Sequence, residues 1–107
     1  MATAPEEWTE ERCLQLIREF KARPVLWDPK DQFYYKKPRK VTAWSEISEA
    51  MGLPADRCKH KLGIMMSSFR REKSRIIHSI RDKADTVYKS SWFAFKEMSF
   101  LIDKAKE

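Results

Sequence analysis

Residues 56–78 constrain what this chain can fold into more than any other stretch. Large apolar residues recur there at steps of four, three, four and seven, namely Cys58, Leu62, Met65, Phe69 and Ile76. This spacing is typical of the buried face of one long α-helix. Such a helix would measure roughly 35 Å at about 1.5 Å per residue, which is more than a small helical domain needs to cover its core. We therefore expect part of it to serve as a working surface.

The remaining faces of this predicted helix are strongly basic. The cations are Arg57, Lys59, Lys61, Arg70, Arg71, Lys73 and Arg75, with His60 and His78 beside them. Between Arg57 and His78, Glu72 is the single acid. A helix of this kind either binds a polyanion or is a well-solvated surface helix. The number of cations favours the polyanion.

The composition places this helix in a globular protein with a charged exterior. The chain has 107 residues, of which 42% are hydrophobic and 36% charged, and this balance excludes disorder. Its length fits one domain, which we assign to residues 8–103, with a flexible leader at 1–7 and a tail at 104–107. Five acids face two bases in residues 1–20, whereas nine bases face two acids in residues 57–83. This split predicts one side that meets a polyanion and another that does not.

Several classes of function are excluded by what the sequence lacks. It has no phosphate-cradling glycine loop and no nucleophile elbow, and Cys58-x-His60 has no second ligand pair at zinc-like spacing, so we expect no enzyme, metal, cofactor or small-molecule substrate. No apolar run approaches the roughly 20 residues that span a bilayer. Cys13 and Cys58 each fall on a predicted buried face, which indicates free thiols in a reducing compartment.

The first part of the chain predicts a helix and an ordered loop. Thr9 can cap a helix that runs to about residue 22, where Pro24 forces the preceding residue out of helical geometry. Residues 24–35 read as a loop whose Leu26 and Trp27 close one end of the core. Residues 36–40 then form a predicted cationic loop. It is a nuclear-import signal or a phosphate-contacting arm, or a merely solvated loop, and its cations are Lys36, Lys37, Arg39 and Lys40.

The next stretch carries a helix-turn-helix pattern. Thr42 can cap a second helix, which Gly52 ends with a left-handed residue before a tight turn over residues 53–56 leads into the long basic helix. At about 100° per residue, His60, Ser67, Arg70 and Arg71 point away from the core, and so does Ile64. Gly63 on the same side either permits close approach of a ligand or is simply tolerated.

The C-terminal part predicts a linker and a fourth helix. Alternating charges over residues 81–85 read as the linker, and Ser90 and Ser91 can cap a helix that continues to the end of the domain. Phe93 and Phe100 lie on the side opposite to its main apolar face, so this helix is either sandwiched in the fold or available to a partner. The predicted core of the whole domain comprises Trp8, Leu16, Ile17, Phe20, Trp27, Trp44, Ile47, Leu62, Met65, Phe69 and Trp92.

Together these residues resemble the MADF domain, a Myb/SANT-like DNA-binding module of animal transcriptional regulators. The similarity extends from about residue 8 to 102, and its anchors are Leu16-Ile17, Pro24-x-Leu26-Trp27-Asp28, Ala43-Trp44-x-x-Ile47, Cys58, Phe69-Arg70-Arg71-Glu72, Ser90-x-Trp92 and Phe100-Leu101. The chain has Leu62 where the family usually has tryptophan, and Met65-Met66 where it usually has Leu-Arg. The resemblance implies an all-α fold: a helix-turn-helix three-helix bundle with a long third helix and an additional C-terminal helix packed on it.

The resemblance also implies sequence-specific binding of double-stranded DNA by a nuclear regulator, with the long helix in the major groove. We expect His60, Ser67, Arg70 and Arg71 to face base edges or nearby phosphates, and Lys59, Lys61, Lys73 and Arg75 to flank the backbone. A homodimer or a protein partner is possible. The alternative function is a protein-interaction module of a chromatin or transcription complex, with four apolar residues as its docking surface: Ile64, Met66, Phe93 and Phe100.

Overall fold

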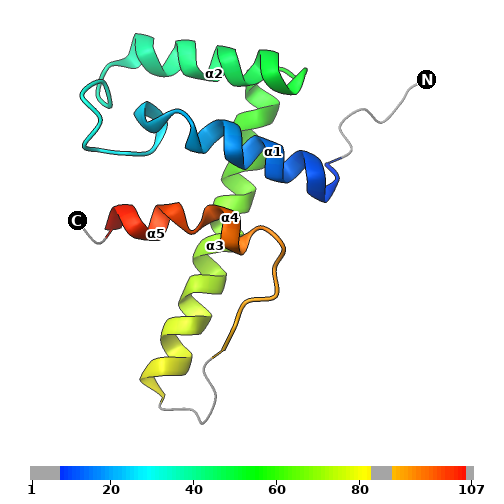
Figure 1. Ribbon diagram of the computed structural model, residues 1–107, viewed down its shortest axis with the longest axis vertical. Helices are drawn as coiled ribbons and strands as arrows, with labels where there is room; N and C mark the ends of the chain where they lie inside the picture. Colours follow the sequence, from blue (N-terminus) through cyan, green and yellow to red (C-terminus); the bar gives the residue numbers. More distant parts are fainter. Residues whose placement is uncertain (1–7, 83–87, 106–107) are drawn as a thin grey trace.

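A computed structural model of the protein describes residues 8–82 and 88–105, and all regular structure in these ranges is helical. The elements are α1 (Glu10–Lys21), the 3-10 helix η1 (Pro24–Leu26), α2 (Lys37–Met51), α3 (Ala55–Arg81), α4 (Phe95–Met98) and α5 (Phe100–Ala105). Figure 1 shows α1 and α2 crossing the first half of α3, while the second half extends beyond them. The predicted all-α bundle with a long helix and a C-terminal helical segment is confirmed.

A capping threonine sets the start of α1, and a proline shortly after its last residue sets its end. The Thr9 hydroxyl accepts a hydrogen bond from the Arg12 amide at 3.1 Å, and Glu10 and Glu11 lie at the positive end of the helix dipole. Arg23, which precedes Pro24, leaves helical geometry with φ −123° and ψ 78°. The buried face of α1 consists of Cys13, Leu16, Ile17 and Phe20.

The loop after α1 closes one end of the core, as predicted. Trp27 and Leu26 pack against the buried cluster. The indole Nε1 of Trp27 donates to the carbonyl oxygen of Phe20 at 3.1 Å, so a polar group at the core's edge is satisfied by the end of α1.

The predicted cationic loop and the Thr42 cap are wrong. α2 begins at Lys37, so the cations of residues 36–40 form its capping residue and first turn, and Thr42 lies inside the helix. Pro38 does not interrupt this turn, because the first residues of a helix need no amide donor and favour the fixed φ of proline. The first turn has neither a side-chain cap nor an acid.

The turn between α2 and α3 has the predicted geometry. Gly52 adopts the left-handed conformation with φ 71° and ψ 27°, and its amide donates to the carbonyl oxygen of Ser48 at 2.9 Å. The Ser48 hydroxyl in turn donates to the carbonyl oxygen of Leu53 at 2.5 Å. These bonds stop α2 and direct the chain into α3 at Ala55, which completes the helix-turn-helix.

The two glycines predict opposite responses to alanine. Gly52→Ala should lower the free energy of unfolding by about 1–2 kcal/mol, because a Cβ is unfavourable at positive φ. Gly63 has helical geometry, and a Cβ built on it meets nothing within 4 Å. Gly63→Ala should therefore raise the free energy of unfolding by about 1 kcal/mol. Urea unfolding of both variants tests this, and equal shifts in the same direction would contradict it.

The core lies where α1, α2 and α3 cross. It includes Leu16, Ile17 and Phe20 of α1, Ile47 and Met51 of α2, and Cys58, Leu62, Met65 and Phe69 of α3. Trp8, Trp27, Trp44 and Trp92 were predicted as core residues, but they are half-buried and pack against this cluster from its rim. Cys13 and Cys58 are buried free thiols, and burial raises the pKa of each above its ordinary value.

The single C-terminal helix that Ser90 and Ser91 were predicted to cap is also wrong. The Ser90 hydroxyl accepts a hydrogen bond from the Trp92 amide at 3.2 Å, which makes a local turn and not a helix start. Helical structure begins later, in α4, and a turn at Ser99 separates it from α5. Of the predicted linker, Arg81 is the last residue of α3 and Asp82 caps it, while 83–85 lie outside the described residues.

Candidate nucleic-acid interface

The outer face of α3 is built by its own periodicity. Cys58, Leu62, Met65 and Phe69 are buried on one stripe, so the positions about half a turn away must face solvent. The residues predicted to face base edges are all exposed there: His60, Ser67, Arg70 and Arg71. The guanidinium of Arg70 donates to the Ser67 hydroxyl at 3.4 Å. α3 thus carries an exposed face that is mainly polar and basic, with Gly63 and Ile64 between His60 and Ser67, and we call it the outer face of α3.

Three of the lysines predicted to contact the DNA backbone pack against aromatic rings at the edges of this face. The Nζ atom of Lys59 lies 5.8 Å from the ring centre of Trp44. That of Lys61 lies 5.9 Å from the ring centre of Trp8, and that of Lys73 lies 5.8 Å from the ring centre of Phe69. Such contacts cover the aliphatic stem of a lysine and leave its ammonium group in water. Each amine is therefore held near one edge of α3 while its charge stays available.

Arg75 differs from the other predicted contacts because it is engaged within the protein. Its guanidinium lies 3.8 Å from the Glu72 carboxylate and 3.4 Å from the hydroxyl of Tyr88. That hydroxyl donates to Glu72 at 2.6 Å, and this bond, more than any charge nearby, holds the pKa of Glu72 below its ordinary value. The Tyr88 amide also donates to the Ser79 hydroxyl at 2.7 Å. Tyr88, which sequence reasoning missed, ties residues 88–92 to one flank of α3.

The second group of cations stands on the first turn of α2. The guanidinium carbon of Arg39 lies 3.8 Å from the ring centre of Phe33, and the Lys40 Nζ lies 3.9 Å from that of Tyr34, so both charges are stacked on aromatic rings. Lys36 and Lys37 are exposed. Cations are unfavourable at the positive end of a helix dipole, and an anion bound there would remove this cost. We call Lys36, Lys37, Arg39 and Lys40 the α2 cations.

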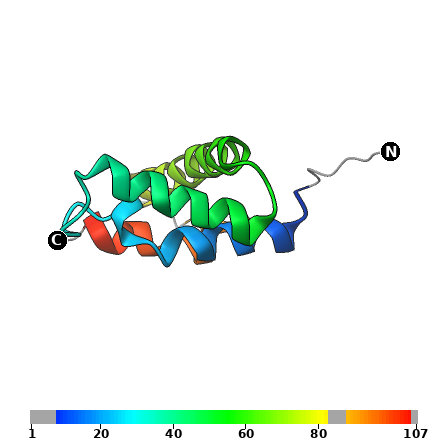
Figure 2. The ribbon, with the colours of Figure 1, turned by 90° about the horizontal axis from the view of Figure 1, so that it is seen from above.

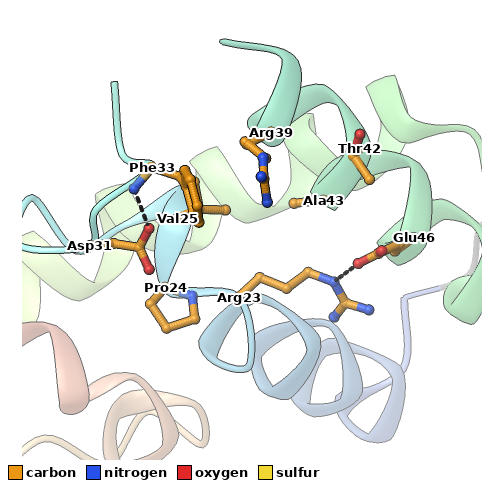
Figure 3. Close-up of a pocket in the computed structure, with 9 residues that line it drawn as sticks. All are labelled: Arg23, Pro24, Val25, Asp31, Phe33, Arg39, Thr42, Ala43 and Glu46. Carbon is orange, nitrogen blue, oxygen red and sulfur yellow. Dashed lines mark hydrogen bonds and ion pairs between the residues drawn. The ribbon is translucent and has the colours of Figure 1, made fainter. Parts of the chain in front are cut away.

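A pocket of about 250 Å³ lies beneath this turn. Figure 3 shows Arg39 beside Phe33 on one side of it and Arg23 reaching Glu46 on the other. The Arg23 guanidinium is 3.0 Å from Glu46 and 2.9 Å from Glu19, and the Asp31 carboxylate accepts the Phe33 amide at 2.8 Å. The charged side chains of Arg23 and Asp31 in this pocket therefore already have partners within the protein, and Arg39 is stacked on Phe33.

The four residues of the alternative, protein-binding surface divide into two pairs. Ile64 and Phe93 are exposed, at 48% and 37%. Met66 and Phe100 are half-buried against the core, and the Phe100 ring lies 4.8 Å from that of Trp27. The structure also exposes Ile77 and Ile80, which sequence reasoning had not singled out. Ile80 lies about 20° around the helix from Phe69, on the continuation of the buried stripe, so periodicity gave no signal for its exposure.

Metal and membrane sites find no support in residues 8–82 and 88–105. No group of three or more His, Cys, Asp or Glu side chains in these ranges could hold a metal ion. None of the helices in the same ranges is both long and apolar enough to cross a bilayer.

Comparison with known proteins gives one family and one curated relative. The model of MADF DNA-binding domains, described as "Alcohol dehydrogenase transcription factor Myb/SANT-like", matches residues 16–101. Transcription factor Adf-1 of Drosophila melanogaster is 29% identical over 94 residues, which cover 88% of this chain and 32% of that protein. The chain therefore spans about a third of the length of this relative. No solved structure matches the chain.

Proposed function

The chain belongs to the MADF family of Myb/SANT-like DNA-binding domains, and on that premise we propose that it binds double-stranded DNA by laying the outer face of α3 in the major groove. The observation that carries this proposal is the exposed row of His60, Ser67, Arg70 and Arg71 on a helix fixed by a helix-turn-helix. Binding of DNA by a transcription regulator agrees with the family and with its relative Adf-1.

The arrangement supports a division of roles between the two basic surfaces. Arg70 and Arg71 can each make a bidentate contact with guanine or a charged contact with a phosphate, and Ser67 and His60 can reach base edges beside them. Lys59, Lys61 and Lys73 flank this row and would meet the backbone on either side. In helix-turn-helix proteins the helix before the recognition helix crosses the backbone, and the α2 cations suit that contact.

The proposed regulator acts in the nucleus on a specific sequence. One helix face with four candidate base contacts reads few base pairs, so useful specificity requires a second copy or another DNA-binding element. Methionine at position 66 removes the arginine that the family usually carries beside this face. The four remaining polar residues must therefore supply the sequence preference.

The proposal is tested by replacing Arg70 and Arg71 with alanine. Cations that neutralise phosphates release condensed counterions, so the log–log slope of affinity against salt should fall by about one unit for each phosphate that is no longer neutralised. Affinity for a random duplex should fall with it. If one of the two arginines reads guanine, its removal should instead cost about 1–3 kcal/mol on the cognate site and little on random DNA. Electrophoretic shifts at several salt concentrations measure both quantities.

The matched control removes two exposed cations from the other side of the molecule. Lys21 of α1 and Lys96 of α4 lie on helices that Figure 2 shows across the bundle from α3. Lys21→Ala with Lys96→Ala lowers the net charge equally and should leave the salt slope unchanged. If the arginine variant binds as the parent does, or if both variants reduce the slope equally, α3 is not the contact surface.

A further inference from the structure

The second half of α3 presents an apolar surface that the bundle does not cover. α3 has 27 residues, so it is about 40 Å long, and Figure 1 shows its second half extending past α1 and α2. Ile77 and Ile80 are exposed there at 49% and 58%. Ile76, one turn before Ile80, is half-buried. Residues three and four apart are neighbours on a helix, so these isoleucines form one patch, which we call the isoleucine patch.

The patch lies on a different side of α3 from the segment that returns along it. Tyr88 reaches Glu72, Arg75 and Ser79, so residues 88–92 cover that flank. Ile77 is two residues before Ser79 and therefore lies about 200° around the helix from it, on the opposite flank. The structure thus packs residues 88–92 on one flank of the projecting half of α3. Ile76, about 60° around the helix from Ser79, lies toward that flank, and Ile77 and Ile80 are exposed away from it.

The patch borders the outer face of α3 and extends away from it. Counting about 100° per residue, Ile77 is seven residues after Arg70 and lies only about 20° from it around the helix, whereas Ile80 lies roughly 140° from Ser67. Isoleucine has no hydrogen bond to offer a base edge or a phosphate. Ile77, beside Arg70, could contact a thymine methyl group, but DNA binding gives no reason for an exposed isoleucine at position 80, far around the helix from the outer face.

The charges around the patch indicate what would cover it. Lys73 and Arg81 stand one turn before and one turn after Ile77, and His78 follows it. Two acids are near in sequence: Glu72 is already bonded to Tyr88 and Arg75, and Asp82, the C-cap of α3, lies about 140° around the helix from Ile77 and about 200° from Ile80. Two copies of this surface packed together would bring cations against cations, which disfavours self-association. A partner with an apolar stripe flanked by carboxylates has the complementary pattern.

We infer that the isoleucine patch is a docking site for an acidic amphipathic helix of another protein. The apolar face of that helix covers Ile76, Ile77 and Ile80, as in other complexes where a helix is bound along an apolar surface. Its carboxylates face Lys73 and Arg81, which favours encounter and fixes its orientation. This function does not depend on DNA binding, and the two would share Lys73, which is also proposed to meet the DNA backbone.

The test uses a synthetic peptide of about 18 residues, five turns of helix. Leucines occupy one helical face of the peptide and glutamates the rest. A second peptide has the same composition in scrambled order, with the same charge but no apolar face. Fluorescence anisotropy with the whole chain should show the patterned peptide binding at least about tenfold more tightly than the scrambled one. Equal binding of the two peptides would overturn the proposal, because attraction would then be purely ionic.

The matched variants are Ile77→Ala with Ile80→Ala, and Val41→Ala. Val41 is 68% exposed on α2, so its removal controls for the removal of exposed apolar surface elsewhere. The isoleucine variant should abolish the preference for the patterned peptide, and Val41→Ala should preserve it. Exposed helical positions tolerate alanine well, and an unchanged melting curve checks that the fold survives. A preference that persists without the isoleucines overturns the proposal.

Two further measurements distinguish a docking site from two alternative roles of the isoleucine patch, a DNA contact and a dimer interface. Duplex affinity of the isoleucine variant should equal that of the parent. A fall in duplex affinity as large as the fall in peptide affinity would assign the patch to the DNA interface and overturn the proposal. Sedimentation of the parent should show a monomer. A dimer that the isoleucine variant dissociates would assign the patch to a second copy of the chain and overturn the proposal equally.

Discussion

Phe20→Ala is expected to lower the free energy of unfolding by about 3–5 kcal/mol, the range for truncation of a large buried ring. Phe20 is 3% exposed, and several elements meet on it. Its ring lies 6.0 Å from that of Trp44 on α2 and 6.4 Å from that of Phe100 on α5, and its carbonyl oxygen holds the Trp27 indole. The cavity left by alanine would loosen the packing of all three rings. Denaturant unfolding measures the change in stability.

Two other aromatic residues serve as graded controls. Trp44 is half-buried at the rim, so Trp44→Ala should cost less than Phe20→Ala. Phe93 is 37% exposed, so Phe93→Ala should change stability little, as surface substitutions usually do. An order of effects that does not follow burial would contradict the assignment of Phe20 to the centre of the core.

Replacing the α2 cations with glutamine is expected to weaken binding to any duplex on the order of a thousandfold at about 0.15 M salt. This magnitude assumes that each of the four holds one phosphate, with a slope of about 0.9 for each phosphate held. The log–log salt slope should fall by about three to four units. Glutamine preserves part of each side-chain stem, so the change is mainly one of charge. Specific and random duplexes should be affected alike, because phosphates carry no sequence information.

The same variant should keep its stability. Each cation removed from the positive end of α2 relieves about 0.3–1 kcal/mol of unfavourable interaction with the helix dipole. Removing the stacking of Arg39 on Phe33 and of Lys40 on Tyr34 costs about 0.5–1 kcal/mol each and offsets part of this gain. A melting temperature equal to or above that of the parent, with weaker DNA binding, is the expected pair of results. Unchanged duplex affinity would reject the phosphate role of α2 and leave that of α3 to its own test.

Much of the fold was predictable because local chemistry and burial agree. The Thr9 cap, the left-handed Gly52 and the apolar stripe of α3 each combine a short-range signal with a position that the core requires. The start of α2 was missed because proline breaks a helix in its interior yet favours its first turn, and the sequence around Pro38 does not distinguish the two. The C-terminal segment was missed because Ser90 can bond to its neighbours in a turn as well as in a cap.

Part of the candidate site was also predictable from the sequence, and part was not. Periodicity alone predicts the exposed row from His60 to Arg71, because one helix geometry relates all its members. It cannot predict that Arg75 is engaged, since its partner Tyr88 is 13 residues away and reaches it only through the return of the chain. Nor can it predict that Ile77 and Ile80 are uncovered. Their exposure depends on where the crossing helices end along α3, which is a property of the whole bundle.

The unbroken length of α3 has a consequence for how a regulatory complex could be assembled. α3 is one continuous helix from Ala55 to Arg81, so a ligand bound near its first turns fixes the orientation of its C-terminal end. Inserting one residue between Phe69 and Ile77 would advance the far end by about 1.5 Å and turn it by about 100°. The two ends of α3 therefore keep a fixed rotational relation, so the orientation of any partner bound at one end would be set by whatever the other end contacts.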